Sequence, residues 1–133
     1  TYLIIIGGHG KLYKSTLEYA ESKICSKNII IIKSMSNPYT ILKKCDYFVL
    51  SSYYEGFGIV LAEADILGLP LISTDIPGPR QFILNNNGYL VENSTDGIYN
   101  GMIDMLHSKI KCMNIDFEKY NDNAVNQFEK IIS

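Results

Sequence analysis

Residues 51–64 read SSYYEGFGIVLAEA, and this stretch joins three local signals. An apolar run ends at Ser51, glycines at positions 56 and 58 mark a tight turn, and an apolar segment of helical length extends from Ile59 to Leu67. A buried strand that passes through a short loop into a helix has this order. We predict such a unit here, with a helix that is buried on nearly every side although it carries Glu63 and Asp65.

Similar apolar runs recur along the chain between segments long enough for helices. They do not alternate with polar residues, which is typical of parallel strands that helices cover on both faces. The predicted strands are Tyr2–Ile6, Asn28–Ile32, Tyr47–Ser51, Leu71–Ser73 and Tyr89–Val91. The predicted fold class is therefore α/β, with a doubly wound parallel sheet.

The predicted helices have their own boundary signals. Asn37 is a suitable N-cap for a short helix that begins at Pro38, and Thr95 is a suitable cap for a helix over about 96–108. Residues 76–79, Ile-Pro-Gly-Pro, predict an ordered loop. Residues from about 110 to 133 are expected to form a C-terminal helical tail.

Composition limits the classes of function. With 133 residues, 47% of them hydrophobic and 20% charged, the chain has the size of one domain, and we predict a single domain over residues 1–133. Twelve Lys and Arg against fourteen Asp and Glu give a net charge of −2, which offers no basic surface to nucleic acid. No apolar run reaches the ~18–20 residues of a membrane span.

The cysteines and histidines predict neither disulfides nor a metal site. Cys25, Cys45 and Cys112 are widely spaced without a Cys-x-x-Cys pair, and the two histidines lack metal-ligand spacing. A reducing cytoplasm fits this pattern best. The first residue is Thr and a strand follows at once, so we expect a fragment cut just before a core strand. The richness in Ile, Asn, Lys and Tyr is typical of AT-rich, bacterial genomes.

The loop that contains Glu55 is the first place to search for a ligand, because open α/β sheets bind ligands beyond the carboxyl ends of their strands. Glu63 lies about one turn into the following helix, and the amide groups of residues 58–60 lie between the two carboxylates. A helix N-terminus attracts phosphate, carboxylates accept hydrogen bonds from sugar hydroxyls, and Gly56 and Gly58 allow close approach to the backbone. The pattern favours a phosphorylated, hydroxyl-rich ligand; a helix cap with a tight turn is an equal alternative.

Glu55-Gly56-Phe57-Gly58 followed by Leu61-Ala62-Glu63-Ala64 resembles the two-glutamate motif of the family 4 (group 1) retaining glycosyltransferases, which have the GT-B fold. Further segments resemble the family in the same order. They are Ile6-Gly7-Gly8-His9-Gly10, residues 37–52, residues 68–75, Gly78-Pro79-Arg80 and residues 87–91. The resemblance covers about residues 3–108 and implies the C-terminal, Rossmann-like domain that binds the donor.

The resemblance implies a nucleotide-diphosphate sugar, such as a UDP- or GDP-sugar, as the donor. Glu55 would contact hydroxyls of the transferred sugar as the catalytic residue of this domain, and Glu63 would hold the ribose. The residues matching the rest of the donor site are Gly56, Phe57, Gly58, Ile59, Val60, Gly8 and Gly10 at the sugar and diphosphate, and Ser34 and Met35 at the base. Transfer would retain configuration without a metal or other cofactor, to a saccharide or lipid-linked acceptor in surface polysaccharide or glycolipid assembly.

The resemblance also indicates what this sequence lacks. Family members carry an Arg and a Lys upstream of the first strand, and an N-terminal domain binds the acceptor; neither segment is in this sequence, and Gln81 stands where relatives commonly carry Glu. We therefore expect the full-length protein to be the enzyme, in the cytoplasm or at the inner face of the membrane, and this fragment alone to be inactive. The alternative is a degenerate module that binds a nucleotide sugar without transferring it.

Several side chains keep two interpretations. Arg80 could contact the diphosphate or pair with Asp75, and Tyr53 and Tyr54 could line the sugar pocket or simply pack. His9 could approach a phosphate or be an ordinary loop residue. A flavodoxin-like receiver module has a similar size, but it needs an acidic pair after the first strand, where this sequence reads Gly-Gly-His-Gly at residues 7–10.

Overall fold

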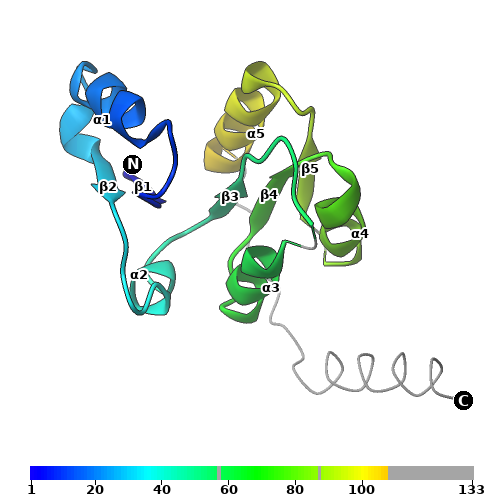
Figure 1. The fold of residues 1–133 in the computed structure, drawn as a ribbon. Helices are drawn as coiled ribbons and strands as arrows, with labels where there is room; N and C mark the ends of the chain where they lie inside the picture. Colours follow the sequence, from blue (N-terminus) through cyan, green and yellow to red (C-terminus); the bar gives the residue numbers. More distant parts are fainter. Residues whose placement is uncertain (57, 87, 108–133) are drawn as a thin grey trace, which may run out of the picture. The chain divides into compact units, whose positions relative to one another are not determined.

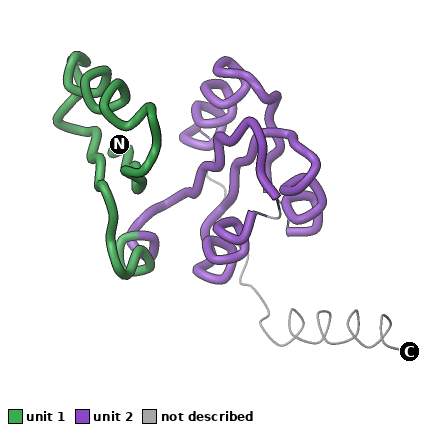
Figure 2. Tube along the Cα trace, viewed as in Figure 1, with its two compact units in different colours: residues 1–41 green, residues 42–133 purple. Residues whose placement is uncertain are grey.

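The computed structural model describes residues 1–56, 58–86 and 88–107 of the chain. The chain divides into two compact units, residues 1–41 and residues 42–133 (Figure 2). Phe57, Cys112 and the predicted C-terminal tail lie outside the described residues. The prediction of a single domain over residues 1–133 stays a prediction.

The first unit contains two parallel strands and the helix between them (Figure 1). Leu3 lies opposite Ile29 and Ile6 opposite Ile32, as expected of an in-register parallel pair. The Oδ1 atom of Asn37 accepts the Tyr39 N–H at 3.1 Å, which confirms Asn37 as a cap. The elements are β1 (Leu3–Ile6), α1 (Tyr13–Glu21), a 3-10 turn η1 (Ser26–Asn28), β2 (Ile29–Ile32) and α2 (Tyr39–Leu42), which crosses the boundary between the units.

The second unit contains a three-stranded parallel sheet in the order β3-β4-β5 (Figure 1). Each strand is followed by a helix, which is the alternation the sequence predicts. The elements are β3 (Phe48–Leu50), α3 (Ile59–Ile66), β4 (Leu71–Thr74), α4 (Pro77–Asn85), β5 (Tyr89–Val91) and α5 (Thr95–His107). All five predicted strands are confirmed, with ends that differ by a residue at most.

Helices cover both faces of this three-stranded sheet. Neighbouring residues of a strand point to opposite faces, so Leu71 and Ile72 mark the two faces of β4. Leu71 belongs to one cluster with Leu61 of α3 and Ile83 of α4. On the other face, a Cβ added at Gly101 of α5 would lie 3.7 Å from Ile72. This is the doubly wound arrangement that the sequence predicts.

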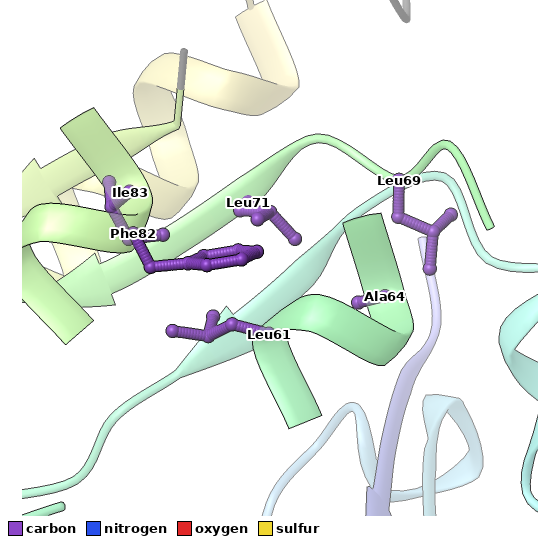
Figure 3. Packing of buried hydrophobic residues seen from close by; sticks show 6 residues of the cluster. All are labelled: Leu61, Ala64, Leu69, Leu71, Phe82 and Ile83. Carbon is purple, nitrogen blue, oxygen red and sulfur yellow. The ribbon is translucent and has the colours of Figure 1, made fainter. Parts of the chain in front are cut away.

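The core of the second unit lies between α3, α4 and β4. Figure 3 shows the ring of Phe82 extending between Leu61 and Leu71. All four residues of β4 are buried, as expected for the central strand of a parallel sheet. The residues of β1 and β2 are half-buried or exposed. The full cluster is Leu61, Ala64, Leu69, Leu71, Phe82 and Ile83.

Helix α3 is buried on one side only. Leu61, Ala64 and Asp65 are buried, which is the i, i+3, i+4 spacing of a single helix face. By contrast, Ile59 is 68% exposed and Ile66 is also exposed. The prediction of a helix buried on nearly every side is therefore wrong, because its apolar residues extend beyond the face that the core encloses.

Two local predictions near the later helices are also wrong. Residues 77–79 form the first turn of α4 instead of a loop, because the amides of a first turn have no partner within the helix and prolines there cost little. At the next helix, Ser94 Oγ accepts the Gly97 N–H at 3.0 Å. Ser94, and not Thr95, therefore caps α5.

Candidate functional site

The loop between β3 and α3 turns sharply at Gly58. This residue has φ 72° and ψ 50°, the left-handed conformation that residues with a side chain rarely adopt. A Cβ here would also lie 3.2 Å from the Leu61 side chain. The Leu61 N–H donates to the Gly58 carbonyl oxygen at 2.8 Å, which closes the first turn of α3. The backbone conformation and packing of this turn therefore require glycine at position 58.

The N-terminus of α3 has no side-chain cap within the described part of the chain. The first amides of a helix lack partners within the helix, and they carry the positive end of its dipole. Ile59 and Val60 are exposed, so this end of the helix faces solvent. A Cβ at Gly56 would meet no atom within 4 Å, which leaves room beside the loop backbone. The arrangement can accept an anionic group.

Glu55 lies in the loop before the start of α3, and Glu63 lies about one turn into the helix. The Glu55 Cγ atom lies 3.7 Å from the position a Gly58 Cβ would take, so the Glu55 side chain lies beside the turn. Glu63 is four residues beyond Ile59 and shares its face of α3. Both glutamates are half-buried. Two carboxylates and an uncapped helix end can together bind hydroxyl groups next to a phosphate.

Three of the undecided side chains are resolved by their surroundings. Arg80 Nη2 lies 2.8 Å from Asp75 Oδ2, which confirms the ion pair between them. Tyr53 is 78% exposed and Tyr54 is 87% exposed, so the packing interpretation of these tyrosines is wrong. Both rings stand on the surface directly before Glu55.

The glycine loop and the loop after β2 lie together in the first unit. The Gly7 N–H donates to the Ile32 carbonyl oxygen at 2.9 Å. A Cβ at Gly8 would lie 2.7 Å from the Lys33 carbonyl oxygen, so the glycine loop packs directly on the residue before Ser34. Gly10 and Ser34 are exposed and Met35 is half-buried. The prediction that these residues serve the same ligand as Glu55 and Glu63 stays a prediction.

A metal or a membrane span has no candidate in the described part of the chain. Residues 1–107, apart from positions 57 and 87, contain no group of three His, Cys, Asp or Glu side chains that could hold a metal ion. No helix in the same ranges is long and apolar enough to cross a bilayer. Metal independence stays a prediction.

Asp65 is buried, as expected of a carboxylate on a helix that was predicted to be buried. Its exposure is 7%, and burial raises the pKa of its carboxyl group. Sequence reasoning missed the role of Gly78, where α4 approaches the backbone of residues 55 and 56 so closely that a Cβ would not fit. A glycine between two prolines at a helix start was the signal there.

The sequence of the chain matches a family of known proteins. The family model described as "Glycosyl transferases group 1" matches residues 1–122. An Escherichia coli protein named UDP-Gal:alpha-D-GlcNAc-diphosphoundecaprenol alpha-1,3-galactosyltransferase is 29% identical over 129 residues, covering 95% of this chain and 33% of the relative. A Staphylococcus aureus (strain COL) protein named poly(ribitol-phosphate) alpha-N-acetylglucosaminyltransferase is 34% identical over 90 residues, covering 66% of this chain and 18% of the relative.

A solved structure has the same fold. The crystal structure of TarM superposes with a TM-score of 0.69 at 31% identity, covering 80% of this chain and 21% of TarM. The predicted α/β fold of a GT-B glycosyltransferase is thereby confirmed. The chain spans about a third or less of the length of these relatives.

Proposed function

Because the chain belongs to the group 1 glycosyl transferase family, we propose that it binds the nucleotide-diphosphate sugar donor for retaining transfer to a saccharide or lipid-linked acceptor. The observation that carries this proposal is the left-handed turn at Gly58, which sets the Glu55 side chain beside the uncapped start of α3. Family membership implies a nucleotide-sugar donor and a sugar or lipid acceptor.

The proposed roles follow from the charges and hydrogen-bonding groups of the loop. The diphosphate would lie at the start of α3, where amide donors and the helix dipole favour negative charge. Glu55 would accept hydrogen bonds from hydroxyls of the transferred sugar and act as the catalytic residue of this chain. Glu63 would accept hydrogen bonds from the ribose. Stabilisation of the departing diphosphate would be the main contribution to rate, without a metal.

The names of the relatives support the biological class. The Escherichia coli relative is named for transfer from UDP-Gal to a diphosphoundecaprenol-linked sugar. A Staphylococcus aureus relative is named for capsular polysaccharide biosynthesis. By analogy, we propose that this chain serves surface polysaccharide or glycolipid assembly in the cytoplasm, at the inner face of the membrane where the acceptor is lipid-linked.

The first experiment is a titration of the isotope-labelled chain with UDP, GDP, ADP, UDP-glucose, UDP-N-acetylglucosamine and GDP-mannose, followed by amide chemical shifts. We expect selective shifts at residues 56–60 and at Glu63 for one base. Shifts scattered over the surface, or no shifts with any ligand, would contradict donor binding by this chain.

Two glutamate variants separate the proposed roles. Glu63→Gln should weaken binding of the nucleoside diphosphate by roughly tenfold or more, because hydrogen bonds to a charged group contribute about 1.5–3 kcal/mol. Glu55→Gln should weaken the sugar nucleotide more than the bare nucleotide. Glu21→Gln, on the exposed end of α1, is the control. Equal weakening of both ligands by both variants would refute this division of roles.

A further inference from the structure

The described residues of the loop between β3 and α3 lie against β4 and α4. The Thr74 Oγ1 atom, at the buried end of β4, donates to the Ser52 carbonyl oxygen at 2.6 Å. The Pro79 ring of α4 is fully buried and lies 3.5 Å from the position of a Gly58 Cβ. The backbone of this loop therefore contacts two other elements through groups that do not face solvent.

The closest of these approaches is at Gly78 in the first turn of α4. A Cβ added there would overlap the Gly56 carbonyl oxygen and would lie 2.7 Å from the Glu55 carbonyl oxygen. A hydrogen on the Gly78 Cα thus points at the Gly56 carbonyl, which is the geometry of a weak C–H···O contact. The carbonyl oxygens of two successive loop residues, Glu55 and Gly56, thus lie against the first turn of α4.

We propose that Gly78 and Thr74 are positioning residues for the Glu55 loop. Gly78 leaves no side chain between α4 and the carbonyls of residues 55 and 56, and Thr74 fixes the start of the same loop through Ser52. Together they set how far the Glu55 carboxylate and the Gly56 amide stand from the start of α3. This inference rests on the proposed function, in which Glu55 contacts the transferred sugar.

The proposal predicts a specific loss of sugar recognition. In Gly78→Ala the loop and α4 must separate by more than about 1 Å, and even a misplacement of ~1 Å costs up to about a hundredfold in positioned chemistry. The readout is the ratio of affinities for a sugar nucleotide and for the matching nucleoside diphosphate. We expect this ratio to fall by roughly tenfold or more, because a displaced Glu55 loses its hydrogen bonds to the sugar, whereas Glu63 lies on α3, outside the displaced loop.

The chain offers matched controls. A Cβ at Gly97, in the first turn of α5, would collide with the Glu92 carbonyl oxygen in the same way, so Gly97→Ala tests the general cost of such a collision. Thr74→Val removes the hydroxyl with little change of shape, and it decides the question where Gly78→Ala does not fold. Its control is Thr16→Val, which removes the 2.8 Å hydrogen bond from Thr16 to the Leu12 carbonyl oxygen in α1.

The experiment measures thermal unfolding and both affinities by calorimetry or chemical-shift titration for the four variants. Lower thermal stability with an unchanged affinity ratio is expected for Gly97→Ala and Thr16→Val, and a lower ratio for Gly78→Ala and Thr74→Val. A wild-type chain that binds donors, with site variants that keep its ratio, would overturn this inference and leave the proposed function standing. A wild-type chain that binds neither ligand, or binds both equally, would instead overturn the donor role itself.

Discussion

The two units differ in how completely helices enclose their strands. In the second unit, β4 lies between α3 and α4 on one face and α5 on the other, and all its residues are buried. In the first unit, Ala20 is the one buried residue among residues 1–41, although both strands consist almost entirely of isoleucine. An apolar strand has the capacity for burial, but neighbours on both faces decide whether burial occurs.

The largest expected difference between the units is the cost of truncating an isoleucine. Ile83→Ala removes a fully buried side chain from the cluster with Leu61 and Phe82, and should lower the free energy of unfolding by about 2–5 kcal/mol. Ile5→Ala in the half-buried β1 should cost about 1 kcal/mol, because less area leaves water on folding. Urea denaturation measures both. Equal losses would show that the greater exposure of the β1 side chains does not reduce their contribution to the free energy of unfolding.

The second expected difference concerns glycines in the loops after β1 and β3. Gly58→Ala should cost about 1–2 kcal/mol, because it forces a left-handed conformation on alanine and brings a methyl group 3.2 Å from Leu61. Gly10→Ala should stay within about 0.5 kcal/mol, since its nearest atom would be 4.0 Å away. The same denaturation series measures both variants. A large loss at Gly10 would mean that this loop is as constrained as the one before α3.

The same contrast explains what the sequence could predict. The five strands were predictable because each apolar run is short and is bounded by turn residues. The loop from Glu55 to Gly58 was predictable as a tight turn because two glycines follow shortly after the end of a strand, the place where open α/β sheets bind ligands. The strands and this loop are both indicated by residues that are neighbours in the sequence, and both are present in the structure.

The remaining features depend on tertiary contacts that no local pattern specifies. The close approach of Gly78 is to the backbone of a loop some twenty residues earlier in the chain. The burial of Asp65 depends on which face of α3 meets the core. Ser94 and Thr95 are both capping residue types, and the structure shows that Ser94 makes the capping hydrogen bond of α5. Sequence therefore located the candidate site and left its supports undetermined.

A smaller effect is expected at the buried carboxylate of the second unit. Burial raises the pKa of Asp65 above its ordinary value of 3.8, so the folded chain binds the proton more tightly than the unfolded chain. Stability should fall as pH rises from about this ordinary value through the raised folded pKa, and stay lower above it. Asp65→Asn should therefore be more stable than the wild type at pH 7, with the gain disappearing below the ordinary pKa. Glu21→Gln, exposed in the first unit, is the control. A gain that is independent of pH would rule out this origin.

The smallest expected effect is a difference in alkylation rate between one thiol of each unit, and it does not involve a change in stability. Burial, and to a lesser degree the neighbouring Asp46 carboxylate, raises the pKa of Cys45, whereas Cys25 is exposed. Because the thiolate is the reactive form, iodoacetamide at neutral pH should alkylate Cys25 before Cys45. Peptide-resolved mass spectrometry measures the two rates separately from that of Cys112.

Two further measurements test whether the folded structure causes this difference in alkylation rate. In urea the rates of Cys25 and Cys45 should converge, because unfolding removes the burial that holds back Cys45. Asp46→Asn should speed alkylation of Cys45 only slightly in the folded chain, since the carboxylate is the smaller of the two causes. A Cys45 thiol that reacts as fast as Cys25 in the native chain would mean that packing against the core of the second unit does not protect Cys45.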